Sequence, residues 1–108
     1  MNQNIAVNLL AALAQESRLA IFRLLVQHAN TGLAVGKISE LLGGMAGATL
    51  SFHLKELTRA GLIQAQPDGR FIIYKPNLEQ MNQLLSFLTD NCCGGLPCHL
   101  NQVSPTCC

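Results

Sequence analysis

All five cysteines of this 108-residue chain lie between residues 92 and 108, and the residues before them contain none. The stretch reads DNCCGGLPCHLNQVSPTCC, with an adjacent pair of thiols on either side of a single one. Thiolates are soft ligands that select soft metal or metalloid centres. Cys92 and Cys93 can hold one such centre as a chelate, and the glycines after them let the chain fold back to bring in Cys98. This spacing predicts a site of three thiolates from one chain.

The terminal pair, Cys107 and Cys108, is open to three interpretations. These thiols could bind a second ion, pass ions to the first site, or take no part in binding. We therefore treat them as secondary candidate ligands.

Other chemistries are also open to the cysteine-rich tail. A structural zinc site usually needs four ligands, often in C-x2-C pairs, and His99 could complete one with three thiolates for zinc, cadmium or another divalent ion. A disulfide-stapled tail would need a strained disulfide between neighbours in a compartment that keeps thiols reduced. A thiol redox sensor is the third alternative, although the carboxyl end of the helix expected before Cys92 disfavours a reactive thiolate.

The composition is apolar for so short a chain, with 49% hydrophobic and only 12% charged residues. It excludes a disordered chain and favours one small domain with a buried partner interface. No apolar run reaches the roughly 18 residues of a membrane span. The first residues lack the basic region and cleavage site of a signal peptide. We therefore expect a cytoplasmic protein with no membrane partner.

Charge is distributed unevenly along the chain, although the net charge is only +1. All seven basic residues lie between Ser17 and Lys75, together with three acids, and the flanks on both sides carry acids alone. A basic middle between acidic flanks is typical of a centre that binds a polyanion such as DNA.

Helical periodicity predicts the elements that must position these groups. Four successive helices are expected over residues 4–15, 16–32, 34–44 and 45–61, with Ser17 as the cap of the second. In the fourth, Leu50, Leu54 and Leu57 recur at the spacing of a core-facing side.

The pattern then changes from helix to strand. Residues 62–66 alternate apolar and polar, 67–69 (PDG) signal a turn, and 70–75 are β-branched and aromatic, which predicts a two-stranded hairpin. Asn77 caps a last helix over residues 78–91. The apolar face of that helix consists of Met81, Leu84, Leu85 and Leu88.

This order of elements predicts a mainly α fold with a small β-hairpin. The third and fourth helices, joined by a glycine-containing turn, have the outline of a helix-turn-helix, and a hairpin directly after them makes it winged. The apolar first and last helices need a partner to cover them. We expect a winged-helix domain for DNA binding and dimerisation over residues 1–91 and a cysteine-rich, inducer-binding tail over 92–108.

The fourth helix is the expected recognition helix. Short polar side chains near its start could meet base edges, cations could meet phosphates, and an exposed aromatic could touch a thymine methyl. The candidates are Thr49, Ser51, Phe52, Lys55 and Arg59. His53 lies at the edge of the buried side, as a structural histidine or a phosphate contact, and Arg70 stands at or beside the wing tip. A surface helix with a mixed polar face would show the same periodicity.

Four stretches agree in order and spacing with a known family: LAALAQESRLAIFRLLV, ISELLGG, TLSFHLKELTRAGLI and DGRFIIYKP. Together they resemble the ArsR/SmtB metalloregulatory repressors over roughly residues 10–88. The resemblance implies a winged-helix homodimer, with the first and last helices at its interface, that represses an operator until a metal or metalloid binds.

The inducer sites of this family vary, and two of them lack their residues in this chain. Where one arsenic site places cysteines at the start of the third helix, this sequence reads LAVGKISEL, with Val35 and Lys37. The zinc site on the last helix needs histidine, and LEQMNQLLSFLTDN has none.

The tail shows a further likeness, because NCCGG resembles an arsenic-responsive subgroup with a vicinal cysteine pair and a third, later cysteine. This resemblance implies trivalent arsenic, as arsenite, as the inducer at Cys92, Cys93 and Cys98, with antimonite, its antimony analogue, as a second candidate. A methylated trivalent arsenical is an alternative that would need only the first pair.

Two other function classes can be compared with a DNA-binding repressor. The scaffold could serve protein contacts in a metal-handling or redox protein, and absence of operator binding would favour that hypothesis. An enzyme is not expected, because no catalytic arrangement of carboxylate or serine with His28, His53 or His99 is found in the sequence and no glycine loop suits a phosphate.

Overall fold

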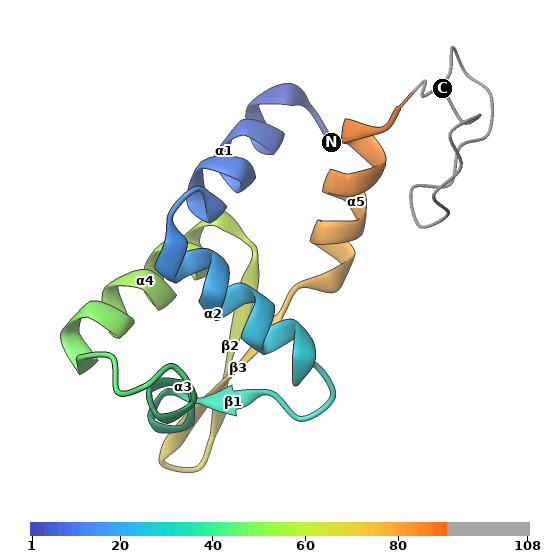
Figure 1. Cartoon of the computed structure of the whole chain (residues 1–108). Helices are drawn as coiled ribbons and strands as arrows, with labels where there is room; N and C mark the ends of the chain where they lie inside the picture. The colour runs from blue at the N-terminus through green and yellow to red at the C-terminus, as the bar shows by residue number, and fades with distance from the viewer. Residues whose placement is uncertain (91–108) are drawn as a thin grey trace, which may run out of the picture.

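The computed structural model describes residues 1–90 of the chain (Figure 1). The elements are α1 (Gln3–Leu13), α2 (Glu16–Gln27), β1 (Leu33–Ala34), α3 (Val35–Leu41), α4 (Gly47–Ala60), β2 (Ile63–Asp68), β3 (Phe71–Pro76) and α5 (Leu78–Leu88). Helix α4 packs against α1 and α2, and the β2–β3 hairpin that follows α4 projects away from α1 and α5. The predicted winged helix-turn-helix is confirmed, with α3 and α4 as the helix pair and β2–β3 as the wing.

Side-chain caps determine where three of the helices begin. Asn2 accepts a hydrogen bond from the Ile5 amide at the start of α1, and Asn77 accepts one from the Gln80 amide at the start of α5. The cap of α2 is Gln15, not Ser17 as expected, because the helix already begins at Glu16 and a capping residue must precede the first turn.

The sheet has three antiparallel strands in the order β1–β3–β2, so the predicted two-stranded hairpin was incomplete. Leu33 pairs with Tyr74, and Ala65 lies opposite Tyr74 on the other side of β3. A two-residue strand is too short to show an alternating pattern in the sequence. Its pairing with β3 joins residues that are some forty positions apart in the sequence.

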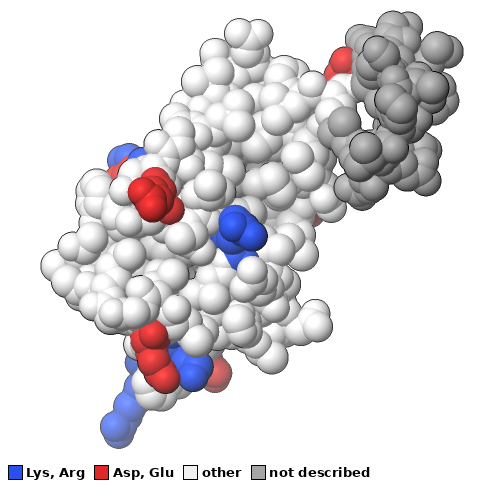
Figure 2. Space-filling model, in the orientation of Figure 1, with Lys and Arg blue, Asp and Glu red and all other residues white. Residues whose placement is uncertain are grey.

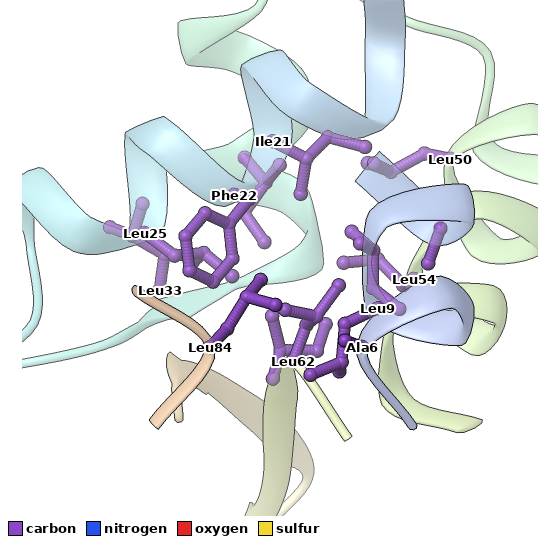
Figure 3. Packing of buried hydrophobic residues seen from close by; sticks show 14 residues of the cluster. Ala6, Leu9, Ile21, Phe22, Leu25, Leu33, Leu50, Leu54, Leu62 and Leu84 are labelled. Atoms are coloured by element: carbon purple, nitrogen blue, oxygen red, sulfur yellow. The ribbon is translucent and has the colours of Figure 1, made fainter. Parts of the chain in front are cut away.

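The core is built from apolar side chains of all the long helices, aliphatic except for Phe22, and Figure 3 shows them converging from α1, α2, α4 and α5. The predicted core side of α4 is confirmed, since Leu50, Leu54 and Leu57 are fully buried. A fully buried leucine stabilises a fold by roughly 1.5–3 kcal/mol. These three residues therefore hold α4 rigidly and leave its other sides outward.

Gly32, in the loop before β1, is the glycine whose substitution we expect to be most costly. Its φ is +70°, a region that costs other residues about 1–2 kcal/mol. An added Cβ would also lie 2.5 Å from Ile73 Cγ2 and 3.0 Å from the Tyr74 carbonyl oxygen. We expect Gly32→Ala to lower the free energy of unfolding by about 2–3 kcal/mol.

Urea denaturation at one fixed protein concentration measures this effect, with Gly36→Ala as the matched control. Gly36 lies inside α3 with nothing within 4 Å of an added Cβ. Alanine there should be neutral or should stabilise the helix by up to about 1 kcal/mol. Equal unfolding free energies for the two variants would contradict the close approach at Gly32.

Candidate nucleic-acid interface

The outer side of α4 carries the short polar and cationic side chains that the sequence assigned to it. Thr49 and Ser51, in the first two turns, are exposed, and Lys55 follows one turn later on the same outer surface. Phe52, at 55% exposure, is an aromatic side chain that the core does not use. The leucines on the opposite side leave this surface free to contact another molecule.

The start of α4 lacks a side-chain cap, unlike the starts of α1, α2 and α5. Its N-cap residue is Ala46, which offers no side-chain hydrogen bond, and the first turn contains no acidic residue. The first amides of a helix lack partners within the helix, and the helix dipole adds partial positive charge there. This end of α4 is therefore suited to an anionic group such as a phosphate.

Cations on and near α4 are only weakly engaged by the protein itself. Arg59 pairs with Glu56 one turn earlier, but its side chain is 73% exposed, and exposed pairs contribute only about 0–1 kcal/mol. Among residues 1–90 the other ion pair joins Lys37 to Glu40 at 3.6 Å, so Lys55 has no acidic partner there. Arg59 and Lys55 can therefore turn to phosphates at little cost.

His53 is buried, with 8% of its surface exposed, which agrees with its position at the edge of the core-facing side. Within the described residues its Nδ1 atom is buried and has no hydrogen-bond partner. The ring lies against Phe52, with centroids 5.7 Å apart, so it also supports that exposed aromatic.

The wing ends in a two-residue turn, Gly69–Arg70, between Asp68 and Phe71. Arg70 is exposed at this tip, as the sequence indicated. Figure 2 shows basic and acidic atoms together at the end of the molecule that holds the wing and α3, while the surface over α1 and α5 is mostly uncharged. Sequence reasoning missed that Phe71 is also exposed, because β-strand periodicity alone does not tell which face is covered.

The α1–α5 face, made of the outer sides of α1 and α5, carries large apolar side chains among polar ones. Figure 1 shows these two helices at the end of the molecule opposite the wing tip. The large apolar side chains that it exposes are Ile5, Val7, Leu10, Leu78, Leu85 and Leu88. In the last helix the predicted apolar side is divided: Leu84 is buried in the core, but Leu85 and Leu88 are about half exposed. An apolar face of this kind marks an interaction site.

The candidate thiolate ligands Cys92, Cys93, Cys98, Cys107 and Cys108 lie outside the described residues. The described chain ends at Asp90, just past α5. Within residues 1–90 no three His, Cys, Asp or Glu side chains gather as a metal site. No helix in that part of the chain is both long and apolar enough to span a bilayer.

Comparisons of sequence agree with this geometry. A helix-turn-helix domain model matches residues 13–64, from the end of α1 into β2. The chain is 32% identical over 88 residues to the HTH-type transcriptional regulator YgaV of Escherichia coli K12, with 82% of this chain and 86% of that protein covered.

Solved structures that resemble this chain are also transcriptional regulators. HlyU from Vibrio cholerae N16961 superposes with a TM-score of 0.63 at 33% identity, covering 82% of this chain and 97% of that one. The homodimeric winged helix-turn-helix DNA-binding domain of Mb0332 from Mycobacterium bovis, a possible ArsR-family regulator, has a TM-score of 0.64 at 26% identity, covering 82% and 81%. A "Possible transcriptional regulator for arsenical resistance" has a TM-score of 0.62 at 26% identity, covering 75% and 79%.

Proposed function

This chain belongs to the helix-turn-helix transcriptional regulators, and we propose that it is a homodimeric repressor of the ArsR type that leaves its operator when trivalent arsenic binds its C-terminal thiolates. The similar proteins are transcriptional regulators, which fits the expectation that the chain is not an enzyme. The proposal has three parts: a DNA contact, a dimer and an inducer.

The observation that carries the DNA contact is the outer side of α4. A recognition helix places its N-terminal residues against base edges in the major groove and its cations near phosphates. Thr49 and Ser51 stand at the uncapped start of α4, and Lys55 lies one turn further along. Arg70 at the wing tip can reach the backbone or the adjacent minor groove at the same time.

The α1–α5 face supports the dimer. Leu85 and Leu88 are half exposed there, although apolar side chains of this size gain about 25 cal/mol for each Å² removed from water. A second copy of the chain can cover this face, and the similar Mb0332 domain is a homodimer. Two recognition helices held by one interface can read two half-sites of a pseudo-palindromic operator.

The thiol spacing of the tail supports trivalent arsenic as the inducer. Soft thiolates prefer soft centres, and arsenite, As(OH)3, can condense with three thiols. Three As–S bonds form, three As–O bonds break, and each thiol proton leaves with a hydroxyl group as water. Cys92, Cys93 and Cys98 supply these thiols from one chain without oxygen or imidazole ligands. The similarity to a possible regulator for arsenical resistance is consistent with this proposal.

Release from DNA would follow from the position of the first thiols in the sequence. Cys92 is four positions after Leu88, the last residue of α5, which we place in the dimer interface. Two half-sites require recognition helices about 34–36 Å apart. Binding arsenic beside the interface would favour a different dimer geometry, and a change in that separation weakens both DNA contacts together.

Lys55→Gln tests the DNA contact, using operator duplexes enriched from a random pool by the wild-type protein. We expect weaker binding to all sequences and a plot of log affinity against log salt that is shallower by about 0.9 for each phosphate that the variant no longer neutralises. Ser51→Ala should instead relax the choice at one base pair, at a cost of about 1–3 kcal/mol.

The matched control is Arg23→Gln, which removes a cation from α2 and should leave the salt slope unchanged. Fluorescence anisotropy between 50 and 200 mM salt, a range over which phosphate contacts change affinity by about 10³–10⁵-fold in other proteins, resolves the difference. Equal slopes for the two variants would remove Lys55 from the interface. Failure of the wild type to enrich any sequence would contradict the DNA-binding function itself.

A further inference from the structure

The wing has an anchored half and a free half. At its base Ile63 pairs with Pro76, both buried, and β1 pairs with Ile73 and Tyr74. Beyond that point no third strand from residues 1–90 accompanies the hairpin, and the residues of its outer half are exposed. The tip is therefore a two-stranded ribbon that stands clear of the domain and is supported by its own ladder.

Phe71 is the first residue of β3 at this tip and is 66% exposed, the highest value among the large apolar side chains of the described residues. It lies opposite Asp68 on the polar face of the hairpin, where its neighbours across the ladder are not core residues. The side chain thus contributes little to folding. Ile72, next to it on the other face, is also exposed.

The charges around Phe71 favour nucleic acid over an apolar protein surface. Arg70 precedes it directly and has no acidic partner closer than 4 Å in the described part of the chain. The tip belongs to the hairpin that follows α4 in the chain, and it lies at the end of the molecule opposite α1 and α5 (Figure 1). Asp68 opposes this arrangement, because its carboxylate would lie near the phosphates that attract Arg70.

We propose that Phe71 is an apolar wedge that enters the minor groove of operator DNA beside Arg70 and partly unstacks one base step. This inference rests on the proposed DNA-binding function and adds a second way of reading sequence to it. Apolar side chains inserted between base steps kink the duplex, and pyrimidine–purine steps are the easiest to unstack. The wing would therefore select operators that have such a step beneath each tip, without hydrogen bonds to the bases.

The test uses the full chain and duplexes enriched from a random pool by the wild type. We expect a TA or CA/TG step to be enriched on each outer flank of the major-groove sites. Dyes at the two duplex ends report bending by energy transfer, and 2-aminopurine at the flanking step reports unstacking. Phe71→Ala should reduce both signals and lower affinity by about tenfold, while its major-groove consensus stays the same.

Two controls separate a wedge from a structural effect. Phe71→Leu keeps an apolar wedge and should restore most of the bend, whereas Val26→Ala removes an exposed apolar side chain from α2 and should change nothing. All variants should unfold at nearly the wild-type temperature. Asp68→Asn, which removes the opposing carboxylate, should tighten binding to every duplex.

The proposal is overturned if Phe71→Ala binds the enriched duplex with wild-type affinity, bend and 2-aminopurine signal, even if Phe71 then proves to contact another protein. It is also overturned if wild-type selection yields a major-groove consensus without any preferred flanking step. Enrichment of no sequence at all is a different outcome, because it contradicts the DNA-binding function on which the wedge depends.

Discussion

Replacement of Leu85 and Leu88 together by glutamate is expected to turn the dimer into a folded monomer and to lower operator affinity by about 10²–10⁴-fold. Both side chains point out of the domain, with 49% and 52% of their surfaces exposed, so the substitutions leave the core intact. Two glutamates on each copy would place four carboxylates in an apolar interface, and buried charges without partners are costly.

The size of this effect follows from bivalent binding. Once one half-site is bound, the second recognition helix is held near its own half-site, which raises overall affinity by about 10²–10⁴-fold over a single contact. A monomer loses this gain although each α4 is unchanged. Sedimentation and operator binding measure the two consequences, and circular dichroism checks that the helices persist.

The control is Val26→Glu, which adds the same charge at an exposed apolar position of α2 outside the α1–α5 face. It should remain dimeric and bind the operator with near wild-type affinity. If the Leu85/Leu88 double variant also stays dimeric, the second copy does not cover this end of α5.

Cys92→Ser or Cys93→Ser should abolish the response to arsenite while operator affinity without arsenite stays the same. In the wild type, excess arsenite should weaken operator binding by about 5–150-fold, which corresponds to a coupling free energy of 1–3 kcal/mol. Serine oxygen is a hard donor and a poor substitute for a thiolate on a soft centre. Anisotropy titrations with and without arsenite, under reducing conditions, measure the response.

Further variants separate the roles of the other cysteines in the tail. Cys98→Ser should lose the response to arsenite but keep a response to methylarsenite, because the methyl group leaves that arsenic only two positions for thiolates. The Cys107/Cys108 double serine variant should retain one arsenic per chain, as measured by elemental analysis. A wild type whose operator affinity ignores arsenite but falls with zinc or cadmium would exclude arsenic as the inducer and leave the repressor itself standing.

Much of this protein could be predicted from the sequence because the relevant interactions are local. Helix periodicity identified Leu50, Leu54 and Leu57 as the core side of α4, and the turn signal at Pro67–Gly69 placed Arg70 at the wing tip. These features depend on neighbours within a few positions, where spacing along the chain and spacing in space agree. The thiol cluster, likewise, is a property of adjacent residues.

Only the tertiary structure decided which of two equivalent residues is covered. Leu84 and Leu85 are neighbours of the same type on α5, yet one is buried in the core and the other faces outward. The short strand β1 and the exposure of Phe71 have the same origin. Each depends on whether an element that is distant along the chain packs against the residues concerned. No local sequence pattern contains that information.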